Sequence, residues 1–321
     1  MRLWSSPYTL RSREALSGKT STNERSGSLL KVEFENGAVG FADIHPWPEL
    51  GDLPLDSQLR LLSEGKTTSL TARSLALAQV DGEARAKNQN LFDGFEVPTS
   101  HFLVNNLSSL RADQVWAEGF RHLKVKLGRD PWGESRRLNE MAGELQNFRL
   151  RFDFNGLLKG DEFISFIERL PSSLRDKIEF VEDPVPWDEE EWIRLSVQTG
   201  TPLALDRFEG PLEQVRGFQW LILKPAIQDP EVWLARRRDL KLCLTSYLDH
   251  PVGQLGAAYE AARLQSTGLH LGACGLVSHF SWVDNEWTRR LSVKGARLIP
   301  PAGSGIGFDD LLHVASWSRI R

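Results

Sequence analysis

The sequence has no long uninterrupted hydrophobic run. No stretch approaches the roughly 20 apolar residues that a membrane-spanning helix requires. The opening segment, MRLWSSPYTLRSREAL, also has no apolar core of the kind found in secretory signal peptides. We therefore expect a cytoplasmic protein that does not interact with a membrane.

Neither an excess of one charge nor a disulfide framework is present. The chain has 39 Lys and Arg residues against 43 Asp and Glu residues, for a net charge of -4. This balance gives no electrostatic reason to expect nucleic acid or an anionic membrane surface as a partner. The two cysteines, Cys243 and Cys274, have apolar neighbours and no CxxC spacing, which favours reduced structural thiols.

The first part of the chain, residues 1–95, has the pattern of a small α+β domain. The patterns predict strands at Leu3–Leu10 and 27–34, a turn at Asn36-Gly37, and helices at 55–64 and 68–88. The polar run from Arg11 to Ser26 is expected to be a loop that can close over a neighbouring site. With 321 residues, the chain exceeds a usual single-core domain, so a second unit is expected.

From Phe102 onward, short apolar runs alternate with helical patterns. Eight such β-runs can be counted, the last being LHLGACG. This alternation predicts an α/β fold, a (β/α)8 TIM-type barrel over residues 96–289. The tail, residues 290–321, is strand-like and then rich in Gly and Pro, and we expect it to pack back on the first domain and complete an α+β capping domain.

Charged residues recur at or just after the ends of the barrel strands. They are Lys124 and Lys126 in HLKVKLG, Asp153 in LRFDFNG, Glu182 in IEFVEDP, Asp206 in PLALDRF and Lys224 in WLILKPA. Their spacing is that of a strand plus a returning helix, so all should meet at the carboxyl end of the barrel.

The three carboxylates form the candidate metal site. A single aspartate at a strand end is usually a helix cap or loop residue, but three buried acids without compensation would be costly. A hard divalent cation removes that cost, so Asp153, Glu182 and Asp206 are predicted to bind Mg²⁺, with Mn²⁺ as a substitute. The alternative is a purely structural network of lysines and carboxylates.

The lysines are candidates for acid–base chemistry. Lys124 and Lys126 are two residues apart on a strand, so both side chains point to the same side. Lys126, nearest the strand end, is the predicted base, with Lys124 as an electrostatic helper and a candidate contact for a substrate carboxylate. Lys224 would be a second acid or base, or a cation that stabilises an anion, against the alternative of a surface lysine.

Together these groups predict removal of a proton α to a carboxylate. The anionic intermediate, an enediolate, would be stabilised by Mg²⁺ while a lysine takes the proton. The expected partner is therefore a small-molecule carboxylate. The spacing does not say what leaves, and it leaves the oligomeric state open.

At these positions the chain resembles the enolase superfamily, in its muconate-lactonizing-like branch. The shared motifs are KxK at 124–126, DxN at 153–155, E(E/D)P at 182–184, a D at 206 and KP at 224–225. Within this branch, LRFDFNG, LKPA and the short capping domain most resemble the o-succinylbenzoate synthase family. That resemblance implies Mg²⁺-dependent syn-dehydration of 2-succinyl-6-hydroxy-2,4-cyclohexadiene-1-carboxylate in menaquinone synthesis.

The resemblance also implies roles for individual residues. Lys126 would remove the α-proton and return it to the departing hydroxyl, while Lys224 would stabilise the enediolate by its charge. The implied substrate-binding residues are Arg151, Asn155, Thr245 and Ser246. The segment TSYLDHPVG departs from the family pattern at Asp249 and His250. For His250, as for His45, a structural role is expected, because neither has a partner at metal-ligand spacing.

Two rival functions remain open at this point. The same lysines could carry out 1,1-proton transfer, as in an N-acylamino-acid racemase or a dipeptide epimerase. A rival of another class is a non-catalytic barrel that keeps the acids for stability or partner binding.

Overall fold

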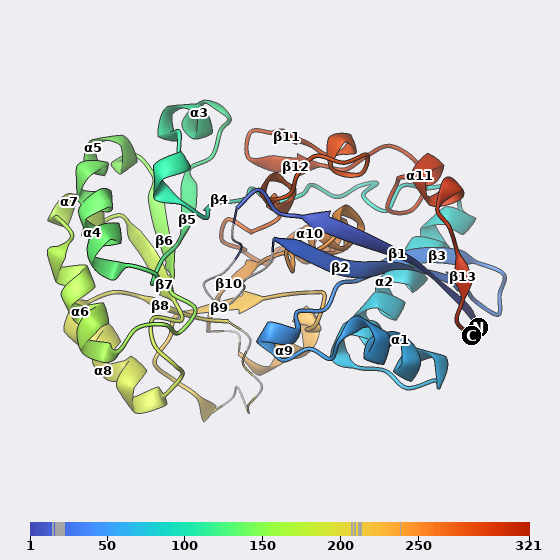
Figure 1. Cartoon of the computed structure of the whole chain (residues 1–321), viewed down its shortest axis with the longest axis horizontal. Helices are drawn as coiled ribbons and strands as arrows, with labels where there is room; N and C mark the ends of the chain where they lie inside the picture. Colours follow the sequence, from blue (N-terminus) through green and yellow to red (C-terminus); the bar gives the residue numbers. More distant parts are fainter. Residues whose placement is uncertain (15, 17–22, 207, 209, 211–213, 238) are drawn as a thin grey trace.

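The computed structural model describes residues 1–14, 16, 23–206, 208, 210, 214–237 and 239–321. It contains a four-stranded antiparallel sheet and a seven-stranded parallel sheet, as well as a short two-stranded one. The two larger sheets lie side by side, with both chain termini at the outer end of the antiparallel sheet (Figure 1). Over the described ranges, no helix is long and apolar enough to cross a bilayer.

The antiparallel sheet has the strand order β13-β1-β2-β3. Its members are β1 (Arg2–Arg11), β2 (Glu24–Glu33), β3 (Val39–Ile44) and β13 (Ser318–Arg319). Helices α1 (Leu55–Ser63) and α2 (Ser69–Ala86) follow β3 in the chain. β13 pairs with β1 at Trp4 and Ser5, so the C-terminal tail returns to the N-terminal sheet as expected. We call this sheet, its two helices and the loop 45–54 the cap.

Helix α2 lies unusually close to the cap sheet. It begins after Thr68, whose side chain accepts a hydrogen bond from the Thr71 backbone N–H at 3.2 Å. On β3, a Cβ added at Gly40 would lie 1.7 Å from the Ala78 carbonyl oxygen. Only glycine allows this approach, and Ala78 joins Leu30 and other residues of the sheet in a buried apolar cluster.

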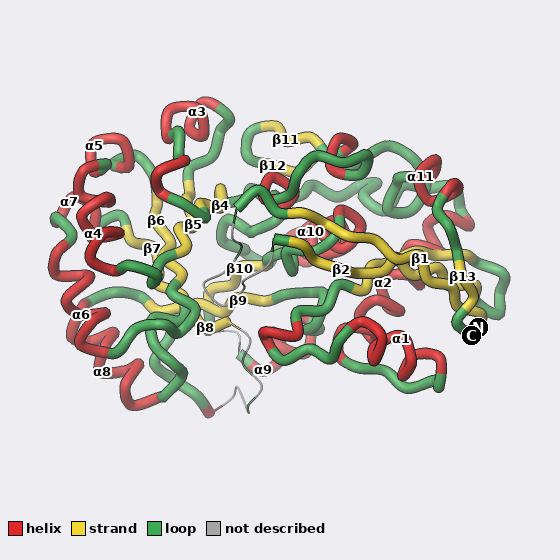
Figure 2. Tube along the Cα trace, in the orientation of Figure 1, coloured by secondary structure: helices red, strands yellow, loops and turns green. Residues whose placement is uncertain are grey.

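The parallel sheet runs in strict chain order. Its strands are β4 (Phe102–Val104), β5 (His122–Lys126), β6 (Arg149–Asp153), β7 (Ile178–Glu182), β8 (Leu203–Asp206), β9 (Trp220–Leu223) and β10 (Lys241–Leu244). The connecting helices are α3 (Ala112–Ala117), α4 (Pro131–Glu140), α5 (Ala142–Leu145), α6 (Gly160–Arg169), α7 (Ser172–Arg175), α8 (Glu189–Thr199), α9 (Pro230–Arg236) and α10 (Pro251–Ser266). Figure 2 shows α4 to α8 as an outer layer around the strands.

Amphipathic patterning places these helices. In α6, Phe163, Ile164, Phe166 and Ile167 are buried, as expected for one apolar helix face. Helix α8 is capped at its N-terminus by Asp188, whose side chain accepts a hydrogen bond from the Glu191 backbone N–H. The expected helix between β8 and β9 falls partly on residues 211–213, which lie outside the described residues.

The eighth β-run closes the barrel through single bridges and not as a continuous strand. Leu271 and Gly275 bridge to Leu242 and Thr245 on one side, and Cys274 bridges to Ser100 on the other. The His101 backbone N–H donates to the Cys274 carbonyl at 2.7 Å. The expected (β/α)8 barrel is therefore confirmed, with its last element irregular.

The C-terminal part continues beyond the barrel. It contains the hairpin β11 (Ser292–Lys294) and β12 (Arg297–Ile299) and the helix α11 (Asp309–Val314). The domain limits 1–95, 96–289 and 290–321 remain a proposal, with which the membership of the sheets is consistent. Much of the expected closing loop, residues 15 and 17–22, lies outside the described residues.

Candidate active site

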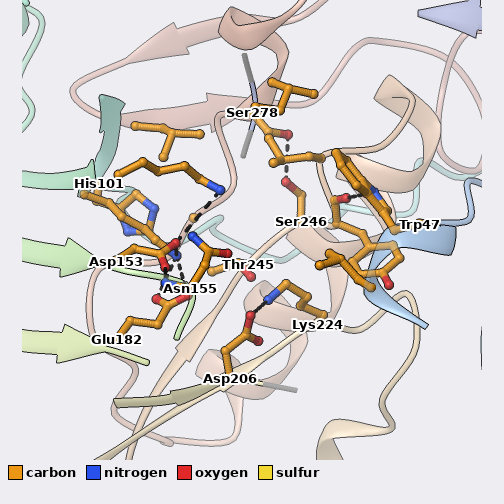
Figure 3. A pocket seen from close by; sticks show the side chains of 18 of the residues that line it. Trp47, His101, Asp153, Asn155, Glu182, Asp206, Lys224, Thr245, Ser246 and Ser278 are labelled. Carbon is orange, nitrogen blue, oxygen red and sulfur yellow. Dashed lines mark hydrogen bonds and ion pairs between the residues drawn. The ribbon is translucent and has the colours of Figure 1, made fainter. Parts of the chain in front are cut away.

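One cavity, at the carboxyl ends of the parallel strands, is lined by all six of the charged residues that were expected to converge (Figure 3). Asp153, Glu182 and Asp206 are the last residues of β6, β7 and β8. Lys124 and Lys126 come from β5, and Lys224 directly follows β9. Strand register explains the convergence, because Lys126 is opposite Asp153, which in turn is opposite Glu182.

Lys124 joins two of the carboxylates. Its Nζ donates to both carboxylate oxygens of Glu182, at 2.6 and 2.7 Å, and lies 3.1 Å from Asp153 Oδ2. Lys126 Nζ is farther from the same Asp153 oxygen, at 3.9 Å. Lys124 thus holds Asp153 and Glu182 in place, whereas the ion pair of Lys126 with a described residue is this longer one.

On the other side of the cavity, Lys224 is paired with Asp206. Lys224 Nζ donates to Asp206 Oδ2, while Asp206 Oδ1 is buried without a hydrogen-bond partner in the described structure. Figure 3 shows this pair apart from Asp153 and Glu182. Since β5 and β9 are four positions apart in an eight-membered ring, Lys126 and Lys224 approach the cavity from opposite walls.

The electrostatics separate the roles of Lys124 and Lys126. Burial lowers the pKa of Lys126, and the neighbouring Lys124 charge adds to this effect against the opposing pull of Asp153. Burial also disfavours the charged form of Lys124, but Asp153 and Glu182 outweigh it and raise the pKa of Lys124. Lys126 is therefore the group better suited to accept and release a proton.

The carboxylates fit a hard divalent cation. Burial, reinforced by Asp153, raises the pKa of Glu182 to about 7, and Asp206 Oδ1 lacks a partner. Such buried oxygens are the ligands that Mg²⁺ prefers. Within the described ranges, no three acidic, histidine or cysteine side chains enclose a metal position as they stand, and Lys124 and Lys224 make ion pairs with the three carboxylates.

Arg151 does not occupy the position expected for it. It is fully buried inside the barrel and is absent from the lining of the cavity. Its Nε donates to Glu179 at 2.6 Å, and its Nη1 lies 2.9 Å from His101 Nδ1. The expectation that Arg151 binds substrate directly is corrected. Arg151 lies inside the barrel behind His101, which itself lines the cavity.

The other three expected substrate-binding residues do line the cavity. Asn155 has a left-handed backbone, with φ of 52°, and its N–H donates to Asp153 Oδ1 at 3.1 Å. Ser246 Oγ donates to Ser278 Oγ at 2.7 Å. Thr245 Oγ1 is buried and has no partner in the described structure. Binding of substrate by these side chains stays a prediction.

Sequence reasoning missed much of the lining. The additional residues are Leu16, Trp47, Leu50, His101, Leu103, Tyr247, Leu248, Gly275, Val277 and Ser278. The positions of His101 and Gly275 beside barrel strands could have indicated a location near the site. Trp47 and Leu50 lie in a proline-rich cap loop, for which the sequence offers no comparable signal. Asp249 and His250 face the boundary between cap and barrel instead.

Comparisons with known proteins agree with this geometry. Residues 3–84 match the family model described as "O-succinylbenzoate synthase, N-terminal domain", and residues 109–222 match "Enolase C-terminal domain-like". An o-succinylbenzoate synthase from Bdellovibrio bacteriovorus is 35% identical over 324 residues, which cover 98% of each chain.

Solved structures show the same fold at low identity. The L-Ala-D/L-Glu epimerase from Bacillus subtilis matches with a TM-score of 0.79 and 18% identity, covering 96% of this chain and 98% of that one. An o-succinylbenzoate synthase from Thermosynechococcus elongatus, complexed with Mg in its active site, matches with a TM-score of 0.69 and 22% identity over 88% and 95%. From the full-length relative and the matched models, the chain belongs to the o-succinylbenzoate synthase family, a family of lyases within the enolase superfamily.

Proposed function

We propose that this chain is a Mg²⁺-dependent o-succinylbenzoate synthase, which removes water from 2-succinyl-6-hydroxy-2,4-cyclohexadiene-1-carboxylate to form 2-succinylbenzoate. The observation that carries the proposal is the convergence of three carboxylates with lysines on opposite walls of one cavity. When bound, Mg²⁺ would be held by Asp153, Glu182 and Asp206 and would stabilise negative charge on the substrate carboxylate.

The protein groups then account for the proton movements. Lys126 Nζ takes the proton from the ring carbon that bears the carboxylate, and the resulting enediolate lies near the Lys224 ammonium. The C–O bond to the ring hydroxyl breaks as Lys126 returns the proton to that oxygen, so that water leaves. The ring becomes aromatic, and Lys126 is again neutral and ready to accept a proton. One lysine suffices because both events occur on the same face.

The residues that line the cavity favour this function over dipeptide epimerisation. A dipeptide carries an α-ammonium group, which needs an anionic partner inside the protein. Among the described residues that line the cavity, the acids are Asp153, Glu182 and Asp206, all at the proposed metal site. The opposite wall, with Trp47, Leu50 and other apolar side chains, suits an uncharged ring better.

The test is turnover of the cyclohexadiene carboxylate with and without Mg²⁺, together with proton exchange on an N-succinylamino acid in deuterated water. Fast Mg²⁺-dependent dehydration without exchange is the expected result. Exchange without dehydration would assign a racemase or epimerase function. The absence of both, in a folded protein that binds Mg²⁺, would contradict the proposal and favour a non-catalytic barrel.

A further inference from the structure

The wall of the cavity that faces the cap is apolar and is built around Trp47. Trp47 is 2% exposed and belongs to a buried cluster with Leu10, Leu16, Tyr247 and Trp282, which joins cap and barrel residues. Figure 3 shows Trp47 on the opposite side of the cavity from Asp153 and Glu182. The place of this indole therefore sets how much room a substrate has beyond the charged groups.

One carboxylate oxygen connects the Trp47 segment to the barrel. Asp52 Oδ2 accepts a hydrogen bond from the Trp47 backbone N–H at 2.8 Å and another from the Tyr247 hydroxyl at 2.7 Å. In return, the Trp47 indole Nε1 donates to the Tyr247 carbonyl oxygen at 2.8 Å. Asp52 lies on the cap and Tyr247 on the loop after β10, so these bonds hold the two parts together at the cavity.

The outer face of the indole is also fixed. The Arg25 guanidinium lies 3.9 Å from the Trp47 ring centroid. Arg25 donates to the Pro46 carbonyl at 3.0 Å and to Glu49 at 2.6 Å, on either side of Trp47 in sequence. Within the cap, Trp47 is thus held on one face, and the bonds with Asp52 and Tyr247 decide its position relative to the barrel.

We propose that the Tyr247–Asp52 hydrogen bond is a latch between cap and barrel that positions Trp47 over the substrate. This inference rests on the proposed function, since the substrate ring is what Trp47 would cover. Tyr247 and Asp52 are positioning residues in it: their hydroxyl and carboxylate act through Trp47 and leave the lysines untouched. The latch should therefore govern how tightly substrate and product are held, more than how fast the proton moves.

The sharpest test is Tyr247→Phe, which keeps the ring that lines the cavity and removes only the hydroxyl. We expect KM and the Kd of 2-succinylbenzoate to rise roughly tenfold, as for a lost hydrogen bond to a charged acceptor, while kcat changes about twofold at most. Tyr259→Phe is the matched control, because Tyr259 contacts Phe92 and Phe95, away from the cavity, and both constants should stay unchanged.

A second variant keeps the proposal testable if the first affects folding. Asp52→Asn removes the charge of the same bond, and combining it with Tyr247→Phe should add little to either single change, because both remove one interaction. Additive effects, or a KM and product Kd equal to those of the unchanged protein, would overturn the latch.

Hydrogen exchange separates this inference from the proposed function. In Tyr247→Phe, the Trp47 backbone N–H should exchange at least fivefold faster, since its acceptor Asp52 loses the hydrogen bond from the Tyr247 hydroxyl, whereas amides of α2 should not change. Unchanged exchange at Trp47 would contradict the latch whatever the reaction is. Faster exchange in a protein that never dehydrates the proposed substrate would keep the latch and remove the proposed function.

Discussion

Two buried groups of carboxyl side chains in this molecule differ in the charges that surround them. The first is the barrel cluster, Asp153, Glu182 and Asp206 with their three lysines. The second, here called the seam cluster, lies between cap and barrel and comprises Tyr8, Asp43, His45, Asp249 and His250. Asp43 and Asp249 in the seam cluster and Asp153 and Glu182 in the barrel cluster are all buried, so the difference between them comes from their neighbours.

In the seam cluster, burial favours the neutral forms. It raises the pKa of Asp43 to about 7 and that of Asp249 well above its ordinary value, and it lowers the pKa of His45 to about 3. The hydrogen bonds on the Asp43 carboxylate come from the Tyr8 hydroxyl at 2.5 Å and the His250 backbone N–H at 3.2 Å, both uncharged.

In the barrel cluster, ammonium groups oppose that effect. Although burial favours the neutral acid, Lys124 and Lys126 lower the pKa of Asp153 below its ordinary value. The comparison teaches that burial alone turns carboxyl groups into neutral packing elements. At Asp153 the neighbouring ammonium groups favour the charged form that metal binding requires. At Glu182, burial and the Asp153 charge still raise the pKa to about 7 despite the contact with Lys124.

The largest expected effect is the loss of Lys126, the proposed general base. Lys126→Ala should lower kcat by roughly a thousandfold or more, because no other group replaces the general base. Circular dichroism and calorimetric Mg²⁺ titration should remain close to those of the unchanged protein. Lys66→Ala, at an exposed lysine paired with Glu64, is the control, and normal turnover in Lys126→Ala would remove Lys126 from its proposed role.

The next effect concerns the metal. Asp206→Asn removes the charge of a proposed Mg²⁺ ligand whose Oδ1 has no partner among the described residues, so Mg²⁺ affinity should fall roughly tenfold or more, with activity following it. Isothermal titration calorimetry measures the affinity, and turnover is measured over a Mg²⁺ series with a chelator blank. Asp284→Asn, at an exposed aspartate paired with Arg13, should change neither. Full turnover in excess chelator would contradict the metal site.

The third prediction tests the neutrality of the seam cluster. Because the pKa of Asp43 rises from 3.8 to about 7 on folding, the folded protein holds this proton over that range and the unfolded chain does not. Ionisation of Asp43 therefore does not reduce the free energy of unfolding below pH 4. As the pH rises from 4 to 7, the free energy of unfolding falls, by about 1.4 kcal/mol for each unit of the pKa shift.

Asp43→Asn removes this dependence. The stability difference between the unchanged protein and the variant, measured by urea unfolding from pH 4.5 to 8, should move in favour of the variant as pH rises. It should become constant above about pH 8. A difference that does not vary with pH would mean that Asp43 is ionised throughout, and the contrast between the two clusters would fail.

The smallest effect is expected for Tyr8→Phe. This change removes the hydrogen bond that lowers the pKa of Asp43, so the pH dependence assigned to Asp43 should move to higher pH. The substitution should lower the free energy of unfolding by about 1–3 kcal/mol, and by more above pH 7, where the Tyr8 hydroxyl donates to a charged Asp43 carboxylate. Urea unfolding compared with Tyr259→Phe measures it, and an equal cost at every pH would show that the hydroxyl does not act through Asp43.

The barrel strands and their charged ends were predictable because both signals are local. Short apolar runs such as LRFDFN define a strand and at the same time place Asp153 at its end. Register then brings strand ends together without further information. The cap strands and the return of the tail to β1 followed from the same kind of pattern.

Errors arose where a side chain has several partners within reach. Arg151 was expected to be a substrate-binding residue, yet it turns toward Glu179 and His101 inside the barrel. Both directions satisfy the alternation of a strand, and the packing of the Arg151 guanidinium against the Phe180 ring depends on residues distant in sequence. The pairing of Glu182 with Lys124, for which the sequence offered no prediction, likewise depends on tertiary contacts.

The sequence by itself determined the fold class and the kinds of groups at the strand ends, because strand and helix periods and residue chemistry are properties of neighbouring residues. Only the tertiary structure decided which lysine is bound to the acids, that Trp47 forms a wall of the cavity, and that Asp43 and Asp249 are buried together. Those outcomes depend on contacts such as Tyr247 to Asp52, 195 residues apart, whose energies exist only after the chain has folded.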